Sequence, residues 1–311
     1  MTESPVSTAR PTLSAVGHPV VLDGGLSTAL EQGGARLDGS LWTARLLDEE
    51  PERIAAAHRA YYLAGATVAT TASYQASVEG FVAAGREAQE ARGLITRSIT
   101  VARRVRDELA ESRPGLTVAA SVGPYGAFLA DGSEYHGRYG VTASRLRDFH
   151  GPRLELLAAA APDVLAVETV PDADEAAVLV ELLDELGVPA WFCYSVSDGR
   201  TNAGQPLDEA YAVLSGSTSV VAAGVNCSSQ AEVLGALRSA GAATGLPGIA
   251  YPNRGGVWDG VAKEWVGFTG IDLSLVASWQ EAGARYLGGC CGTGPSDIYA
   301  LAAHLLGADP W

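Results

Sequence analysis

The chain has 311 residues, 47% of them hydrophobic, and a net charge of −15 from 21 Lys and Arg against 36 Asp and Glu. Such an acidic chain lacks the basic surface that binds phosphate backbones, which excludes nucleic acid as a partner. No run of about 18 apolar residues occurs, so we expect neither a membrane-spanning helix nor a membrane partner. The length suits a (β/α)8 barrel of about 250 residues with insertions.

Eight short runs rich in Val, Ala, Ile and Leu predict eight strands in chain order. The runs are nearly continuous rather than alternating, which is typical of strands buried on both faces of a parallel sheet. They cover residues 19–25, 67–73, 116–124, 164–170, 189–196, 219–227, 246–253 and 284–292.

Helical patterns fill the intervals between these strands. The first begins at Pro51, a residue that is well tolerated in the first turn of a helix. The predicted helices cover residues 51–66, 86–112, 142–160, 172–187, 206–215, 229–241, 271–283 and 295–306. Eight β–α units predict an α/β fold, a single-domain (β/α)8 TIM barrel over residues 18–311. We expect residues 1–17 to form a frayed tail, and residues 127–140 to form a glycine-rich insertion loop.

Polar and thiol side chains collect where the predicted strands end. They are Asp23, Thr71, Glu168, Asn226, Cys227, Tyr251, Cys290 and Cys291. In a TIM barrel the carboxyl ends of the strands form one mouth, and active sites lie there. We therefore expect these residues to meet, although the chain separates them widely.

Three of the four cysteines belong to this group. Four cysteines in so long a chain form no disulfide framework, which favours a cytoplasmic protein with metal-binding or core thiols. Cys290 and Cys291 are neighbours within several glycines, which let the backbone turn both thiols to one side. With Cys227 they offer three thiolates and leave one open position, the pattern of a catalytic zinc site. Other interpretations are core cysteines and a strained disulfide between adjacent residues.

Asp23 and Glu168 end two otherwise apolar strands. A buried carboxylate is costly unless it is paired, so these two acids favour an ammonium group of a substrate, with helix capping or a solvated loop as the alternative. Gly24 follows Asp23 and would let backbone N–H groups approach a carboxylate. Together these groups suit an α-amino acid.

Over residues 19–306 the chain resembles the zinc-dependent homocysteine S-methyltransferases, in particular the branch that uses S-methylmethionine. The motifs that carry the resemblance are LDGGLSTALEQGG, ATTASYQAS, SVGPYGAFLADGSEY, VETVPDADEA, GVNC, YPNRG and GGCCGTGP. It implies one Zn²⁺ per chain on Cys227, Cys290 and Cys291, and a homocysteine amino group on Asp23 and Glu168. Thr71 and the backbone near Gly24 would hold the carboxylate. Asn226 is also predicted to bind substrate. Arg254 departs from the family pattern, in which a small residue is common.

The resemblance implies a mechanism without cobalamin. Homocysteine would bind zinc as a thiolate and attack the methyl group of a sulfonium donor, S-methylmethionine or S-adenosylmethionine, to give methionine. The leaving group is a neutral thioether, so no general acid is required. Trp42, Tyr74, Tyr125 and Tyr251 are candidates for a donor pocket that holds the cation against aromatic rings, with ordinary packing as their alternative role.

Several alternatives remain open. The acceptor could be selenocysteine or another thiol or selenol, and the donor could be a betaine. A zinc lyase or hydrolase would use histidine and carboxylate ligands, and no histidine pair has a suitable spacing. A zinc-storage protein would carry a redundant cysteine cluster. The expected partners are small-molecule substrates, and the sequence makes no prediction of the oligomeric state.

Overall fold

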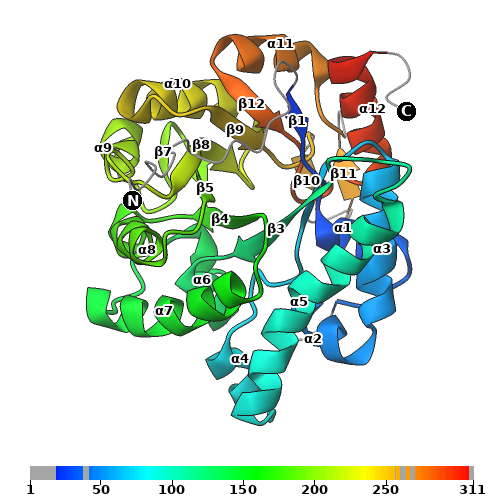
Figure 1. Cartoon of the computed structure of the whole chain (residues 1–311). Helices are drawn as coiled ribbons and strands as arrows, with labels where there is room; N and C mark the ends of the chain where they lie inside the picture. Colours follow the sequence, from blue (N-terminus) through cyan, green and yellow to red (C-terminus); the bar gives the residue numbers. More distant parts are fainter. Residues whose placement is uncertain (1–18, 38–41, 256, 260–263, 267–269, 308–311) are drawn as a thin grey trace, which may run out of the picture.

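The computed structural model describes residues 19–37, 42–255, 257–259, 264–266 and 270–307, so the predicted tail lies outside the described residues. Its main sheet has eight parallel strands, hydrogen-bonded in the order β1-β12-β9-β8-β5-β4-β3-β2 (Figure 1). The strands are β1 (Val20–Val21), β2 (Val68–Thr70), β3 (Thr117–Val122), β4 (Val164–Val170), β5 (Ala190–Tyr194), β8 (Val220–Asn226), β9 (Gly248–Tyr251) and β12 (Ala284–Leu287). All eight lie within the predicted strand segments.

A seam between β1 and β2 closes this sheet into a barrel. The backbone N–H of Thr67 donates to Val21 O at 2.8 Å. Further along the same seam, the Asp23 carboxylate accepts a hydrogen bond from Thr70 N at 2.7 Å and one from Thr70 Oγ1 at 2.8 Å. A side chain therefore replaces the missing ladder bonds, and it brings Asp23 to the mouth of the barrel.

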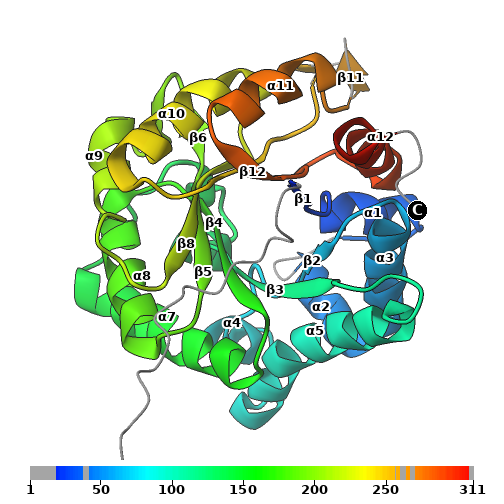
Figure 2. The same ribbon diagram turned by 45° about the horizontal axis from the view of Figure 1, so that its top comes forward.

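The helices surround the barrel, as Figure 2 shows, and confirm the predicted (β/α)8 architecture. Those that follow the strands are α3 (Pro51–Leu63), α5 (Ala88–Leu109), α7 (Ala143–Ala159), α8 (Ala173–Leu186), α9 (Leu207–Ala212), α10 (Val233–Thr244), α11 (Leu273–Glu281) and α12 (Pro295–Leu306). Side chains cap several of them. Thr142 accepts from Arg145 N before α7, and Asp172 accepts from Asp174 N before α8. None of the described helices has the length and apolar character needed to span a bilayer.

Short elements that the sequence did not predict lie outside this β–α repeat. They are α1 (Leu26–Gln32), α2 (Trp42–Glu49), α4 (Val78–Ala83), α6 (Tyr125–Leu129), η1 (Ser133–Tyr135), and the hairpins β6 (Val196–Ser197) with β7 (Arg200–Thr201) and β10 (Val257–Asp259) with β11 (Glu264–Val266). The short helix η2 (Gln230–Glu232) lies within the predicted helix over residues 229–241. The expected loop at residues 127–140 is thus partly wrong, because it contains the end of α6 and all of η1.

Side chains alternate between two cores along the strands. On β5, Trp191 and Cys193 point into the barrel, whereas Phe192 and Tyr194 pack against the helices. Cys193 has no exposed surface, which agrees with a core role for the fourth cysteine. Trp191 is also fully buried, so large side chains fill the barrel below the mouth.

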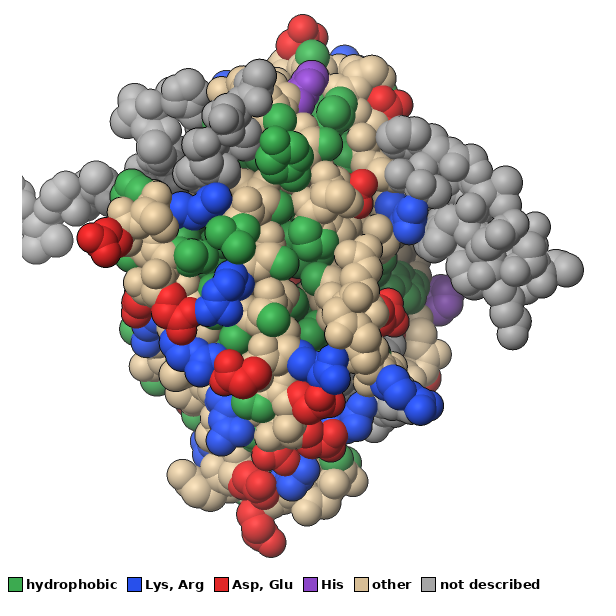
Figure 3. All heavy atoms as spheres, turned by 90° about the vertical axis from the view of Figure 1, so that its right-hand side faces the viewer, with side chains coloured by type: hydrophobic (Ala, Val, Ile, Leu, Met, Phe, Trp, Pro, Cys, Tyr) green, Lys and Arg blue, Asp and Glu red, His purple; other side chains and the backbone are tan. Residues whose placement is uncertain are grey.

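The outer surface carries both charge signs. Figure 3 shows basic and acidic side chains interspersed on the face that includes α3 and α5. Arg59 pairs with Glu108 there, and Arg104 pairs with Glu52 at 2.8 Å. Exposed pairs of this kind contribute little stability, so the fold depends mainly on the two cores.

Candidate metal and substrate site

A cavity of about 300 Å³ opens at the carboxyl ends of the barrel strands. This is where active sites of TIM barrels lie. Its lining includes seven residues predicted at strand ends: Asp23, Thr71, Glu168, Cys227, Tyr251, Cys290 and Cys291. The structure therefore brings together residues from both ends of the chain, and it does so through strand order rather than sequence proximity.

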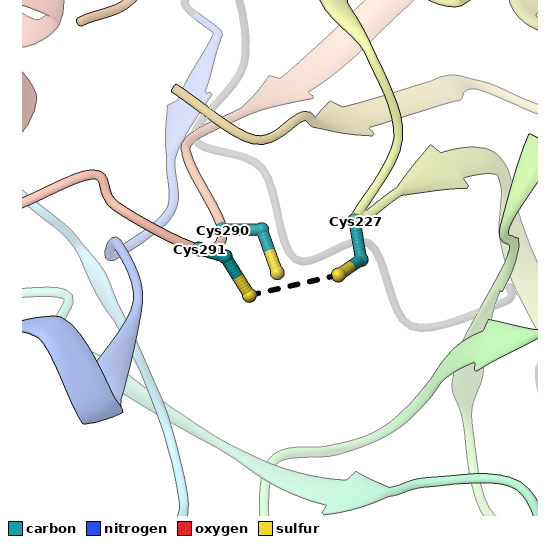
Figure 4. Close-up of side chains that lie close together, drawn as sticks. All are labelled: Cys227, Cys290 and Cys291. Atoms are coloured by element: carbon teal, nitrogen blue, oxygen red, sulfur yellow. Dashed lines mark hydrogen bonds between the residues drawn. The ribbon is translucent and has the colours of Figure 1, made fainter. Parts of the chain in front are cut away.

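Three thiols converge on one side of this cavity (Figure 4). The Sγ atoms of Cys227, Cys290 and Cys291 all lie within 4.8 Å of one another. Cys227 Sγ and Cys291 Sγ are 3.7 Å apart. Two ligands of a tetrahedral zinc ion, each about 2.3 Å from the metal, are separated by about 3.8 Å. In the described part of the chain this is the one group of three or more Cys, His, Asp or Glu side chains with such convergence.

The backbone after β12 explains how adjacent cysteines face one way. Cys290 N donates to Pro252 O at 2.8 Å, and Cys291 N donates to Asn253 Oδ1 at 3.2 Å. Both partners follow β9, so the thiol turn is attached to the neighbouring strand end. The chain has left the strand geometry here, and the strict alternation of side chains no longer applies.

Glycines make this turn possible. A Cβ at Gly289 would lie 2.2 Å from Thr293 Cγ2, and one at Gly292 would lie 2.1 Å from Arg254 Cδ. Gly292 also has a φ of +79°. Cys227 has a φ of +48°, which is unusual for a residue other than glycine. Such strained backbone is common at functional sites, where the surrounding structure enforces it.

The three thiols perturb each other's protonation. Hydrogen bonds from Cys227 and Cys290 lower the pKa of Cys291 well below its usual range. Contacts of Cys290 with Cys227 and Cys291 raise the pKa of Cys290. A thiolate thus forms readily at one position, while ionising all three requires a cation among them. The donor set fits a soft divalent ion such as zinc.

Two buried carboxylates face the same cavity. Asp23 is 4% exposed and Glu168 is 8% exposed. Burial, together with the charge of Glu168, raises the pKa of Asp23 to about 7. Burial also raises the pKa of Glu168 to about 7, although Ser121 Oγ donates to Glu168 Oε1. Among the described residues that line the cavity there is no Lys or Arg, so a cationic ligand group would meet both acids unopposed.

Comparisons with known proteins agree with this geometry. The sequence profile of the homocysteine S-methyltransferase family matches residues 20–305. The chain belongs to the homocysteine S-methyltransferase family. A homocysteine S-methyltransferase of Escherichia coli (strain K12) is 43% identical over 294 residues, which cover 92% of this chain and 94% of the relative. Homocysteine S-methyltransferase 1 of Zea mays is 42% identical over 309 residues, covering 94% and 95%.

Solved structures of this family superpose on the whole barrel. The metallated form of the homocysteine methyltransferase MmuM from Escherichia coli has a TM-score of 0.83 and 42% identity. The match covers 93% of this chain and 96% of that one. An oxidised form of the same enzyme matches with a TM-score of 0.82. The family resemblance read from the sequence motifs is therefore confirmed.

Two polar residues predicted to bind homocysteine have other partners in this family member. Ser73 Oγ donates to Ser121 O at 2.7 Å, so the Thr71 hydroxyl must donate to Ser73 Oγ, 2.7 Å away. Thr71 lines the cavity without a free hydroxyl proton. Asn226 is fully buried and is not among the lining residues; its amide bonds Thr169 N at 2.6 Å and Thr169 Oγ1 at 2.8 Å. It supports Thr169, whose φ is +60°.

The predicted aromatic pocket is only partly assembled. Tyr74 and Tyr251 line the cavity. Tyr125 does not; its ring packs against Phe128 and Phe149, with centroids 5.6 and 5.0 Å away. Tyr125 is the first residue of α6, and this helix directs the ring toward α7. The side chain of Trp42 lies outside the described residues.

Sequence reasoning missed several lining residues, and Tyr135 is the aromatic one among them. It belongs to η1, within the segment predicted to be a loop, and its hydroxyl lies 4.0 Å from Cys227 Sγ. The only sequence signal was a tyrosine in an insertion at the carboxyl end of a strand, where loops reach the barrel mouth.

Proposed function

We propose that this barrel is a zinc-dependent, cobalamin-independent homocysteine S-methyltransferase, with the activity contained in one domain over residues 18–311. It transfers a methyl group from a sulfonium donor, S-methylmethionine or S-adenosylmethionine, to homocysteine and forms methionine. One observation carries the proposal: a single cavity combines three convergent thiols with two buried carboxylates, and no basic side chain among its described lining residues neutralises them. Family membership supports the same conclusion. Its predicted location, the cytoplasm, would keep the thiols reduced.

Cys227, Cys290 and Cys291 would hold the zinc ion. Bound zinc supplies a Lewis acid that allows a substrate thiol to react as its thiolate at neutral pH. The three cysteines leave one tetrahedral position for that substrate. Their spacing and their soft donor atoms support this assignment.

The amino-acid end of homocysteine would bind at the two buried carboxylates of the same cavity, its carboxylate side. Asp23 and Glu168 would accept hydrogen bonds from its ammonium group and become ionised as they do so. Gly25 N already donates to Thr293 O at 3.0 Å, so Gly24 N is the backbone donor that we assign to the carboxylate. A Cβ at Gly24 would lie 2.6 Å from Thr293 O, so only glycine fits this close approach.

Methyl transfer needs positioning and charge rather than acid catalysis. The acceptor sulfur must approach the methyl carbon in line with the donor sulfur, from about 3–3.5 Å. The new carbon–sulfur bond forms as the old one breaks, and its electron pair remains on the donor sulfur as a neutral thioether. The acidic lining, which also includes the exposed Glu31, favours a cationic donor over a neutral one. No histidine lines the cavity in the described chain, which fits a reaction that requires no proton donor.

The alternative acceptors, selenocysteine and other thiols or selenols, have no separate observation in their favour.

Methionine formation tests the proposal. Zinc-loaded protein is incubated with homocysteine and either S-methylmethionine or S-adenosylmethionine, and methionine is quantified. We expect turnover with at least one donor and none after zinc is removed. Absence of methionine with both donors, in protein that carries one zinc per chain, would contradict the proposed function.

A further inference from the structure

Residues 125–139 place an aromatic side chain at the outer edge of the cavity. Tyr135 lines the cavity, and its hydroxyl lies 4.0 Å from Cys227 Sγ. The side chain remains 41% exposed, whereas Asp23 and Glu168 are at most 8% exposed. The carboxylates therefore mark the inner end of the cavity, and Tyr135 marks the end that faces solvent.

The first half of this segment is held by close backbone contact. A Cβ on Gly126 of α6 would lie 2.3 Å from Glu134 N in η1. The Glu134 side chain is itself buried at 2% exposure. The residue before Tyr135 is thus packed directly against α6. This contact fixes the backbone position from which the Tyr135 side chain extends.

The second half of the segment is anchored by hydrogen bonds. Tyr139 Oη donates to Glu175 Oε2 at 3.1 Å. Glu175 Oε1 accepts from Tyr125 N at 2.6 Å and contacts His150 Nε2 at 2.8 Å. One buried carboxylate therefore ties both ends of residues 125–139 to α7 and α8.

Arg138 adds a further anchor next to the tip. Its backbone N donates to Asp172 Oδ2 at 2.9 Å, and its Nε donates to Ala203 O at 2.9 Å. Moving Tyr135 away from the cavity would disturb several of these bonds together. The ring is therefore preorganised at its position, and a preorganised group loses little entropy on binding.

We propose that Tyr135 determines specificity on the methyl-donor side. Its ring forms the wall against which the methylsulfonium cation packs, and its hydroxyl donates to Cys227 Sγ. This inference rests on the proposed function, in which homocysteine occupies the inner end at Asp23 and Glu168. The second substrate must then occupy the outer end, and a cation between acidic groups and an aromatic face is attracted by both.

Kinetics of two substitutions test this role. Tyr135→Leu removes the ring, and we expect the KM for S-methylmethionine to rise about tenfold while the KM for homocysteine changes less than about twofold. Tyr135→Phe retains the ring and should keep the donor KM within about threefold of the original value. Tyr299→Leu, which changes an exposed tyrosine of α12, is the matched control and should alter neither constant.

A second measurement does not depend on activity. In zinc-free protein, the rate at which iodoacetamide alkylates Cys227 is followed by mass spectrometry. We expect Tyr135→Leu and Tyr135→Phe both to increase this rate, since each removes the hydroxyl next to Cys227 Sγ, and Tyr299→Leu to leave it unchanged.

The outcomes separate this inference from the proposed function. A wild-type protein that makes no methionine contradicts the proposed function, while the alkylation rates still decide whether Tyr135 covers Cys227. A Tyr135→Leu protein with an unchanged donor KM overturns the inference, whether or not the homocysteine KM rises. A Cys227 alkylation rate equal to that of the wild type in both variants overturns the contact with the thiol.

Discussion

The two sides of the cavity are prepared for their ligands in different ways. The carboxylate side is complete without a ligand, because Asp23 accepts two hydrogen bonds from Thr70 and both acids have a pKa of about 7. The thiol side consists of three sulfur atoms within 4.8 Å of one another, and no Lys or Arg among the described lining residues balances them. The two carboxyl groups can stay neutral in the free protein, whereas the three thiolates require a metal ion. Substitutions on the carboxylate side and on the thiol side should therefore affect different properties of the enzyme.

The largest effect is expected on the thiol side. Cys290→Ser removes one of three ligands, so zinc affinity and methionine formation should fall together, each by about a hundredfold or more. Zinc content by elemental analysis and initial rates measure the two losses. Cys193→Ala is the control, because this buried cysteine lies in the barrel core and should retain zinc. Full activity of Cys290→Ser without bound zinc would refute the metal assignment.

A smaller and more selective effect is expected on the carboxylate side. Glu168→Ala removes a buried acceptor for the ammonium group, and the KM for homocysteine should rise about tenfold to a hundredfold. Zinc content and the donor KM should change little. Glu31→Gln, on the exposed rim, is a control that keeps the buried pair intact. An unchanged homocysteine KM in Glu168→Ala would contradict the assignment of Glu168 to the ammonium group of homocysteine.

The pH dependence gives the smallest effect, and its sign follows from the raised pKa values. Below pH 7, Asp23 and Glu168 become protonated in the free protein and cannot pair with an ammonium group unless they release protons. kcat/KM for homocysteine should therefore fall as the pH decreases from 8 to 6. The decrease should be shallower in Glu168→Gln. Equal slopes in the two proteins would show that another group controls the profile.

The same shifts affect stability in the opposite direction. The folded-state pKa of each acid lies above its unfolded-state value, so burial of the charged form destabilises the free protein above about pH 7. That cost decreases as the pH falls from 7 toward 4. When the pH is lowered from 8 to 6, the free energy of unfolding of zinc-free protein should thus increase more in the wild type than in Glu168→Gln. Urea denaturation measures both changes.

The sequence predicted the barrel and the thiol group because both depend on strong local signals. Continuous apolar runs identify the strands, and the glycines around Cys290 and Cys291 reveal a turn that no ordinary strand needs. The closure of the barrel then brings Cys227 to the same mouth. Strand order alone is sufficient for that step.

Details that depend on neighbouring strands could not be predicted. The Thr71 hydroxyl donates to Ser73 Oγ because β2 pairs with β3. This pairing brings Ser121 into hydrogen-bond contact with both Thr71 and Ser73. Asn226 of β8 bonds Thr169 of β4 because these two strands lie on either side of β5. Tyr135 was missed because its position is set by the packing of α6, η1 and Glu175, which leaves no periodic pattern in the sequence.

The central claim is that three cysteines hold zinc and leave one position for the substrate sulfur. Zinc X-ray absorption of the loaded protein, recorded with and without homocysteine, tests it most directly. The account predicts about three sulfur ligands in the free protein and about four when homocysteine is present, and the change should be absent with methionine. Four protein-derived ligands that do not change on adding homocysteine would describe a structural zinc site and contradict the account.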